Sequence, residues 1–67
     1  MSLEVLKNRM RSTINSLEPG KEFMLRDIEN DPPAQLGRVL YEEVVAGRIK
    51  DVQYIGKVAG VEKYRKI

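Results

Sequence analysis

Apolar side chains recur at steps of three and four along the N-terminal part of the chain, at Leu3, Leu6, Met10, Ile14 and Leu17. This spacing places them on one stripe of an amphipathic helix. Ser2 is a suitable N-cap residue, and Pro19-Gly20 is a helix-stop signal. The pattern predicts a helix over about 3–17.

Two short patterns follow between residues 21 and 30. In "KEFML", Phe23 and Leu25 alternate with Met24, which predicts a short strand over 21–25 with the first two side chains turned inward. In "RDIEN", Ile28 is the one apolar anchor, which predicts a short helix over 26–30. A helix of this length needs packing against the rest of the molecule to be stable.

The stretch "NDPPAQLGRVLYEEVVAGRI" predicts the longest internal helix, over about 32–46. Asp31 is a suitable N-cap and Pro32 suits the first helical position, while Gly47 is typical of a helix end. A buried ridge is expected at Leu36, Leu40 and Val44.

Gly37 lies inside this helix, where glycine costs about 1 kcal/mol relative to alanine. A residue with that cost suggests a close approach by another part of the structure. The supporting helix over 26–30 is the favoured neighbour, and a nucleic-acid backbone or a protein partner is the alternative.

The C-terminal segment is rich in β-branched and aromatic residues, which favour strands, at Ile49, Val52, Tyr54, Ile55, Val61, Tyr64 and Ile67. Gly56 and Gly60 are expected to bracket a hairpin loop with Lys57 at its tip. The segment therefore predicts a hairpin over about 49–67. Tyr54 and Tyr64 are interpreted as a cross-strand pair over the core, with a base-stacking platform as the alternative.

The chain of 67 residues contains no cysteine and no histidine. One domain spanning residues 1–67 is expected, without disulfides, thiolate metal sites, zinc-finger patterns or histidine-based catalytic triads. The carboxylate pairs Glu42–Glu43 and Asp27–Asp31 have no other acid–base group beside them, so no enzymatic activity and no cofactor are predicted. No apolar run reaches a membrane span and no signal-peptide pattern is present, so a cytoplasmic protein is expected, without a membrane partner.

Charge is unevenly distributed along the chain. Residues 1–25 carry a formal charge of +1, residues 26–47 carry −3, and residues 48–67 carry +4. The C-terminal third is therefore the segment expected to face phosphates.

The order helix, short strand, short helix, long helix and hairpin describes a small α+β domain. It resembles the winged helix, a helix-turn-helix variant whose C-terminal hairpin is the wing, and the resemblance covers essentially the whole chain. The segments "FMLRDI", "LGRVLYEEV" and "YIGKVAGVEKY" are also similar to small uncharacterised proteins of Gram-positive bacteria and their phages.

The resemblance implies sequence-specific binding to double-stranded DNA, with the N-terminal half of the 32–46 helix in the major groove. The groove-facing candidates are Pro33, Ala34, Gln35, Arg38 and Tyr41. A glutamine can pair with the major-groove edge of adenine, and an arginine with that of guanine. The alternative for Gln35 and Arg38 is an ordinary solvated helix face.

The wing of the resemblance would contact phosphates through Arg48, Lys50, Lys57, Lys63 and Arg65. Lys63 and Arg65 are two residues apart and are expected on one face of the sheet. The alternative is that lysines protect a sheet edge from aggregation.

The acidic middle segment argues against tight DNA binding by one copy, and a homodimer would sum the contacts of two. The expected role is a small non-catalytic transcription regulator of a phage or mobile element. The alternative function is a protein–protein interaction module with the same fold and no bound nucleic acid.

Overall fold

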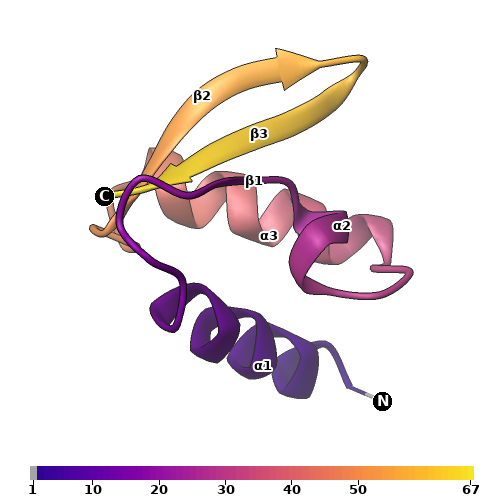
Figure 1. Cartoon of the computed structure of the whole chain (residues 1–67). Coiled ribbons are helices and arrows are strands. Elements are labelled where there is room, and N and C mark those ends of the chain that lie inside the picture. The colour runs from indigo at the N-terminus through magenta and orange to yellow at the C-terminus, as the bar shows by residue number, and fades with distance from the viewer. Residues whose placement is uncertain (1) are drawn as a thin grey trace.

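The computed structural model describes residues 2–67, which form three helices and a three-stranded antiparallel sheet (Figure 1). In chain order the elements are α1 (Leu3–Asn15), β1 (Glu22–Phe23), α2 (Leu25–Ile28), α3 (Ala34–Val45), β2 (Val52–Val58) and β3 (Val61–Lys66). The α+β fold class is confirmed, and the elements follow the predicted order.

Helix α1 begins where predicted but ends before its predicted end at residue 17. Ser2 Oγ accepts a hydrogen bond from the backbone N–H of Val5 at 3.3 Å, as an N-cap side chain does. At the other end, the buried Lys66 Nζ donates to the carbonyl oxygen of Ile14 at 3.1 Å. The side chain of Lys66 thus satisfies carbonyl groups that the C-terminal end of the helix leaves without a helical partner.

The starts of α2 and α3 also differ from the prediction. Leu25 is the first residue of α2, not the last of a strand over 21–25, and Asp27 Oδ2 accepts from the backbone N–H of Met24 at 2.8 Å. Asp31 has φ +48° and does not cap α3, which starts at Ala34. The physical reason is the double proline: Pro33 disfavours the helical region for the residue before it, so the helix cannot include Pro32.

The sheet has the order β1-β3-β2. Tyr54 and Tyr64 are direct partners in the β2–β3 pairing, and the register shifts between Tyr54 and Gly56. The turn itself is Ala59-Gly60, with φ values of +53° and +78°, as in a two-residue type I′ turn. Gly56 therefore belongs to a bulge inside β2, and the expected loop between two glycines with Lys57 at its tip is wrong.

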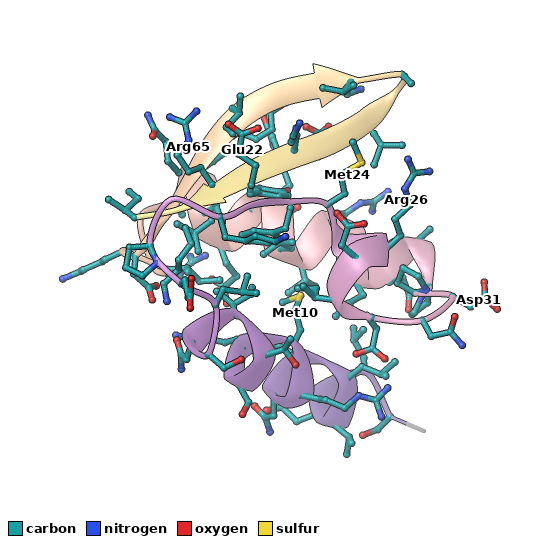
Figure 2. The ribbon with its side chains drawn as sticks, viewed as in Figure 1. Met10, Glu22, Met24, Arg26, Asp31 and Arg65 are labelled. Atoms are coloured by element: carbon teal, nitrogen blue, oxygen red, sulfur yellow. The ribbon has the colours of Figure 1, made fainter. Side chains whose placement is uncertain are left out.

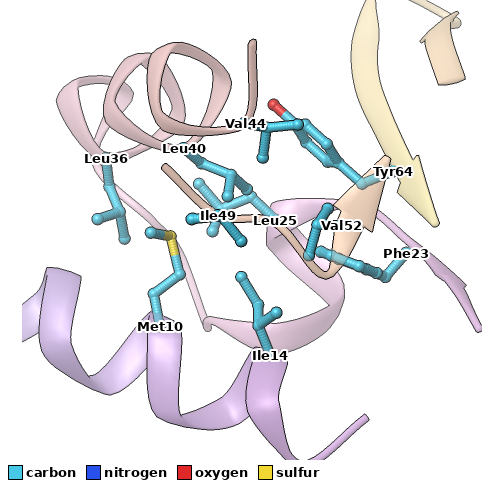
Figure 3. Close-up of a cluster of buried hydrophobic side chains, with 10 residues drawn as sticks. All are labelled: Met10, Ile14, Phe23, Leu25, Leu36, Leu40, Val44, Ile49, Val52 and Tyr64. Atoms are coloured by element: carbon cyan, nitrogen blue, oxygen red, sulfur yellow. The ribbon is translucent and has the colours of Figure 1, made fainter. Parts of the chain in front are cut away.

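One cluster of ten buried apolar side chains joins the helices to the sheet (Figure 3). The predicted ridge of Leu36, Leu40 and Val44 is confirmed, since all three are buried in this cluster. Phe23 and Tyr64 supply its aromatic part, with ring centroids 5.7 Å apart. The remaining members are Met10, Ile14, Leu25, Ile49 and Val52.

Gly37 faces α2, as the packing interpretation predicts. A Cβ atom added there would lie 3.8 Å from Leu25 Cδ2, with no closer neighbour. This is ordinary van der Waals contact, so the glycine permits no closer approach than alanine would. The expectation of an unusually close approach is therefore wrong.

Helix α3 lies between α1 and the hairpin in the view of Figure 1. Its buried ridge packs into the core, which leaves the opposite side of the helix exposed. The side chains on that exposed side are the first candidates for a binding surface.

Candidate nucleic-acid interface

The outward face of α3 carries the two side chains that sequence reasoning assigned to base reading. Gln35 and Arg38 are both exposed, and within residues 2–67 neither side chain makes a hydrogen bond or an ion pair. Pro33 and Ala34 are exposed at the N-terminal end of the same helix. Because Gln35 and Arg38 are three residues apart in a regular helix, they lie on nearly the same face.

Tyr41 continues this face toward the sheet. It is 37% exposed, and its ring packs edge-to-face on that of Tyr54 with 5.1 Å between centroids. Tyr54 in turn packs on the buried Tyr64 at 5.7 Å. The interpretation of Tyr54 and Tyr64 as a cross-strand pair is therefore confirmed. Part of the Tyr41 ring is covered by its contact with Tyr54. The aromatic contacts join the outward side of α3 to β2.

Lys63 and Arg65 share a face of the sheet as expected, but they are not free. Lys63 Nζ lies 3.2 Å from Glu22 Oε1, and Arg65 Nη2 lies 2.7 Å from Glu22 Oε2. Hydrogen bonds from Arg65 and then Lys63 hold the pKa of the Glu22 carboxyl below its usual value. Figure 2 shows Glu22 and Arg65 beside each other where β1 pairs with β3. Sequence reasoning missed Glu22 because the pairing of β1 with β3 spans most of the chain.

The other predicted phosphate contacts behave in two ways. Lys57 Nζ lies 3.7 Å from Glu62 Oε1, and Arg48 Nη1 lies 3.0 Å from Glu43 Oε2. Lys50 is exposed and has no ion pair within the described residues. Glu22 and Glu43 are the two carboxylates from outside residues 48–67 that pair with the cations of this segment, so folding lowers the charge of +4 to about +2 but does not cancel it.

The acidic middle segment is neutralised in the same way. Glu43 is only 8% exposed and lies between Lys7, at 3.2 Å, and Arg48. Hydrogen bonds from Lys7 and then Arg48 lower the pKa of Glu43. Glu29 is buried and accepts two hydrogen bonds from Arg9. The charge of −3 counted along the segment therefore overstates the acidity of its surface.

Sequence reasoning also missed Arg26. It is exposed on α2 and has no ion pair within the part of the chain that the structure describes. Figure 2 shows it on the side of α2 nearer the hairpin. There it lines a groove that also includes Pro33, Ala34 and Gly37 of the α3 start. The only signal in the sequence was its position as the first residue of the predicted supporting helix over 26–30.

Metal-binding clusters and membrane-spanning helices are not found among the described residues. Among residues 2–67, no three acidic, histidine or cysteine side chains gather as a metal site would require. None of the described helices combines the length and apolarity needed to cross a membrane. Comparison with protein families, with characterised proteins and with solved structures gives no match.

Proposed function

We propose that the protein binds double-stranded DNA sequence-specifically, as a small winged helix, with the N-terminal half of α3 in the major groove. The observation that carries the proposal is that Gln35 and Arg38 lie side by side on the exposed face of a helix whose opposite face is buried in the core. Within residues 2–67, neither side chain makes a hydrogen bond or an ion pair. Glutamine and arginine are both residue types that can hydrogen-bond the major-groove edges of purines. The protein acts by occupying its site in the cytoplasm, without catalysis.

The electrostatic support comes from two groups of cations. Arg26, Arg38 and Lys50 are exposed and have no ion pair within the described residues. Lys57, Lys63 and Arg65 are paired, but exposed ion pairs contribute only about 0–1 kcal/mol each, so phosphates can replace their carboxylate partners. Because part of this charge must first be released, a single copy binds weakly, and a homodimer on a two-fold site binds more tightly.

A mobility-shift titration on a pool of duplexes tests the proposal. Arg38→Ala is expected to change which sequences are preferred, with a loss of about 1–3 kcal/mol on the preferred site. Arg11→Ala is the matched control, because Arg11 is an exposed arginine on α1. It removes the same charge and should leave the preference unchanged.

The hairpin is tested by Lys57→Ala in the same titration. It should weaken binding to all sequences alike and reduce the salt dependence by about one phosphate contact. If no duplex is shifted at low salt, or if Arg38→Ala and Arg11→Ala behave identically, the proposal is wrong.

The second candidate function is docking to another protein. The observation that favours it is that Lys57, Lys63 and Arg65 of the hairpin are already paired with carboxylates, which lowers the positive charge that the hairpin offers to phosphates. Recovery of a protein partner, together with no duplex shift at low salt, would favour this function over the first.

A further inference from the structure

The outer part of the hairpin extends beyond the third strand of the sheet. The pairing of β1 with β3 reaches no further along β3 than Tyr64, so within residues 2–67 the hairpin from residue 55 to residue 63 is a two-stranded ribbon. Figure 1 shows both strands continuing away from β1 toward the turn. A two-stranded ribbon is only marginally stable by itself. Its direction relative to α3 therefore depends on contacts other than pairing with β1.

A bulge lies where this ribbon begins. The register shifts between Tyr54 and Gly56, which leaves Ile55 without a partner on β3. A bulge bends its strand and increases the local twist. On the helix side, the groove of about 270 Å³ lies between the start of α3 and the tip residues Gly60 and Val61. The ribbon is thus bent at its base, and its tip is not packed directly on the start of α3.

Tyr54 is the side chain that joins the base of this ribbon to α3. Its ring packs edge-to-face on that of Tyr41, with 5.1 Å between centroids. The ring of its strand partner, the buried Tyr64, lies 5.7 Å away. The half-buried Tyr54 ring is therefore held by the helix on one side and by β3 on the other.

The phenol of Tyr54 continues this connection to Glu62. Glu62 lies two residues before Tyr64, on the same face of β3, so it is a diagonal neighbour of Tyr54 across the strands. A hydrogen bond with the Glu62 carboxylate, together with burial of the phenol, raises the pKa of Tyr54 to about 12. Glu62 Oε1 also lies 3.7 Å from Lys57 Nζ. Contacts thus run without a gap from Tyr41 on α3 to the cation of the ribbon.

We propose that Tyr54 is a positioning residue, which fixes the direction of the ribbon relative to α3 so that Lys57 reaches the phosphates of the duplex that α3 reads. The ring of Tyr54 provides the contact with α3, and its hydroxyl provides the contact with Glu62. The part of the inference that concerns DNA rests on the proposed function. The direction of the ribbon is a property of the free protein and is measurable without DNA.

Residual dipolar couplings of the backbone amides test the direction of the ribbon in the free protein. Tyr54→Phe keeps the ring but removes the hydroxyl. In the unaltered protein the couplings of α3 and of residues 57–62 should fit one common orientation. In Tyr54→Phe the couplings of residues 57–62 should no longer fit the orientation that α3 defines, whereas those of α1 should still fit. The amide spectrum of each variant shows whether its fold is intact.

Tyr64→Phe is the matched control for this measurement. It removes a hydroxyl from the adjacent ring, which is buried in the core against Phe23. The couplings of its ribbon and of α3 should fit one orientation, as in the unaltered protein.

Mobility-shift titrations test the consequence for DNA binding. Tyr54→Phe should weaken binding to all duplexes about threefold and leave the sequence preference unchanged, because it acts through a phosphate contact. In a Lys57→Ala background it should have no further effect, since both substitutions remove the same contact. In an Arg38→Ala background it should keep its full effect.

Three results would overturn the proposal. These are an unchanged direction of the ribbon in Tyr54→Phe, equal changes in Tyr54→Phe and Tyr64→Phe, and a loss of DNA binding by Tyr54→Phe that is the same with and without Lys57. If the unaltered protein shifts no duplex, DNA binding is wrong, and the dipolar couplings alone decide whether Tyr54 positions the ribbon.

Discussion

Lys66 shows at the scale of one residue how a charged side chain can hold two elements together. The residue is only 7% exposed, its Nζ contacts the last carbonyls of α1, and the same atom lies 3.0 Å from Asp51 Oδ2. An ammonium at a helix C-terminus is favoured by both the free carbonyls and the helix dipole. The C-terminal strand is thereby tied to the N-terminal helix.

Replacing Lys66 with methionine should lower the free energy of unfolding by about 1–3 kcal/mol, because the donor to the α1 carbonyls is lost while the apolar stem remains. Chemical denaturation measures the change. Lys21→Met is the matched control, since Lys21 is exposed and has no ion pair within the described residues. Equal effects of the two substitutions would show that the cap contributes nothing.

Gly37 offers a gain in stability at the same scale. A Cβ atom there meets only Leu25 Cδ2, at an ordinary 3.8 Å, so Gly37→Ala should add up to about 1 kcal/mol through helix propensity. Thermal unfolding should then occur several degrees higher. A lower melting temperature would mean that Leu25 cannot accept the extra methyl group.

At the scale of elements, periodicity predicted which segments are helices and strands, but it did not predict their ends. The α3 ridge follows from spacing alone. The pairing of Tyr54 with Tyr64 depends in addition on the bulge between Tyr54 and Gly56, which shifts the register of the hairpin. The start of α3 was misplaced because a good cap residue, Asp31, precedes two prolines whose steric effect dominates. The turn was misplaced because Gly56 forms a bulge, which looks like a loop glycine in sequence.

The corrected turn leads to a prediction for the hairpin. Ala59 has φ +53°, a left-handed conformation that disfavours alanine and is tolerated by asparagine. Ala59→Asn should therefore stabilise the fold by about 0.5–1 kcal/mol, measured by denaturant unfolding. An unchanged or lower stability would indicate that the turn conformation differs from the one described.

At the scale of the whole molecule, charge is organised by contacts distant in sequence. Glu22 is paired with β3, Glu29 with α1, and Glu43 with both α1 and Arg48. These ion pairs could not be predicted by counting charges along segments of the sequence, because each ion pair joins residues that only the tertiary structure brings together. Sequence reasoning did place Gln35 and Arg38 on an exposed face, since that follows from helical spacing around a buried ridge.

These pairs predict how stability depends on pH. The carboxyls of Glu22, Glu43 and Asp51 have pKa values lowered by their basic partners, from ordinary values of 4.5 for Glu and 3.8 for Asp. Each contributes stability above its unfolded pKa and loses it as the pH falls through the lowered folded pKa. The denaturant concentration at the midpoint of unfolding should stay constant between pH 7 and about pH 5, and it should decrease as the pH is lowered further.

Substituting single carboxylates shows which of them cause the loss of stability at low pH. Glu22→Gln should remove part of the acid dependence, whereas Glu18→Gln, at an exposed residue without an ion pair among the described residues, should not. Equal stability of the unaltered protein from about pH 6 to 3 would contradict this description of its ion pairs.

The most direct test of DNA binding is an NMR titration of the 15N-labelled protein with mixed-sequence duplex DNA at low and high salt. At low salt we expect chemical-shift changes concentrated at Gln35, Arg38 and the hairpin, with α1 little affected, and at high salt we expect much weaker binding. An unchanged spectrum at low salt, or shifts that spare α3, would contradict this expectation.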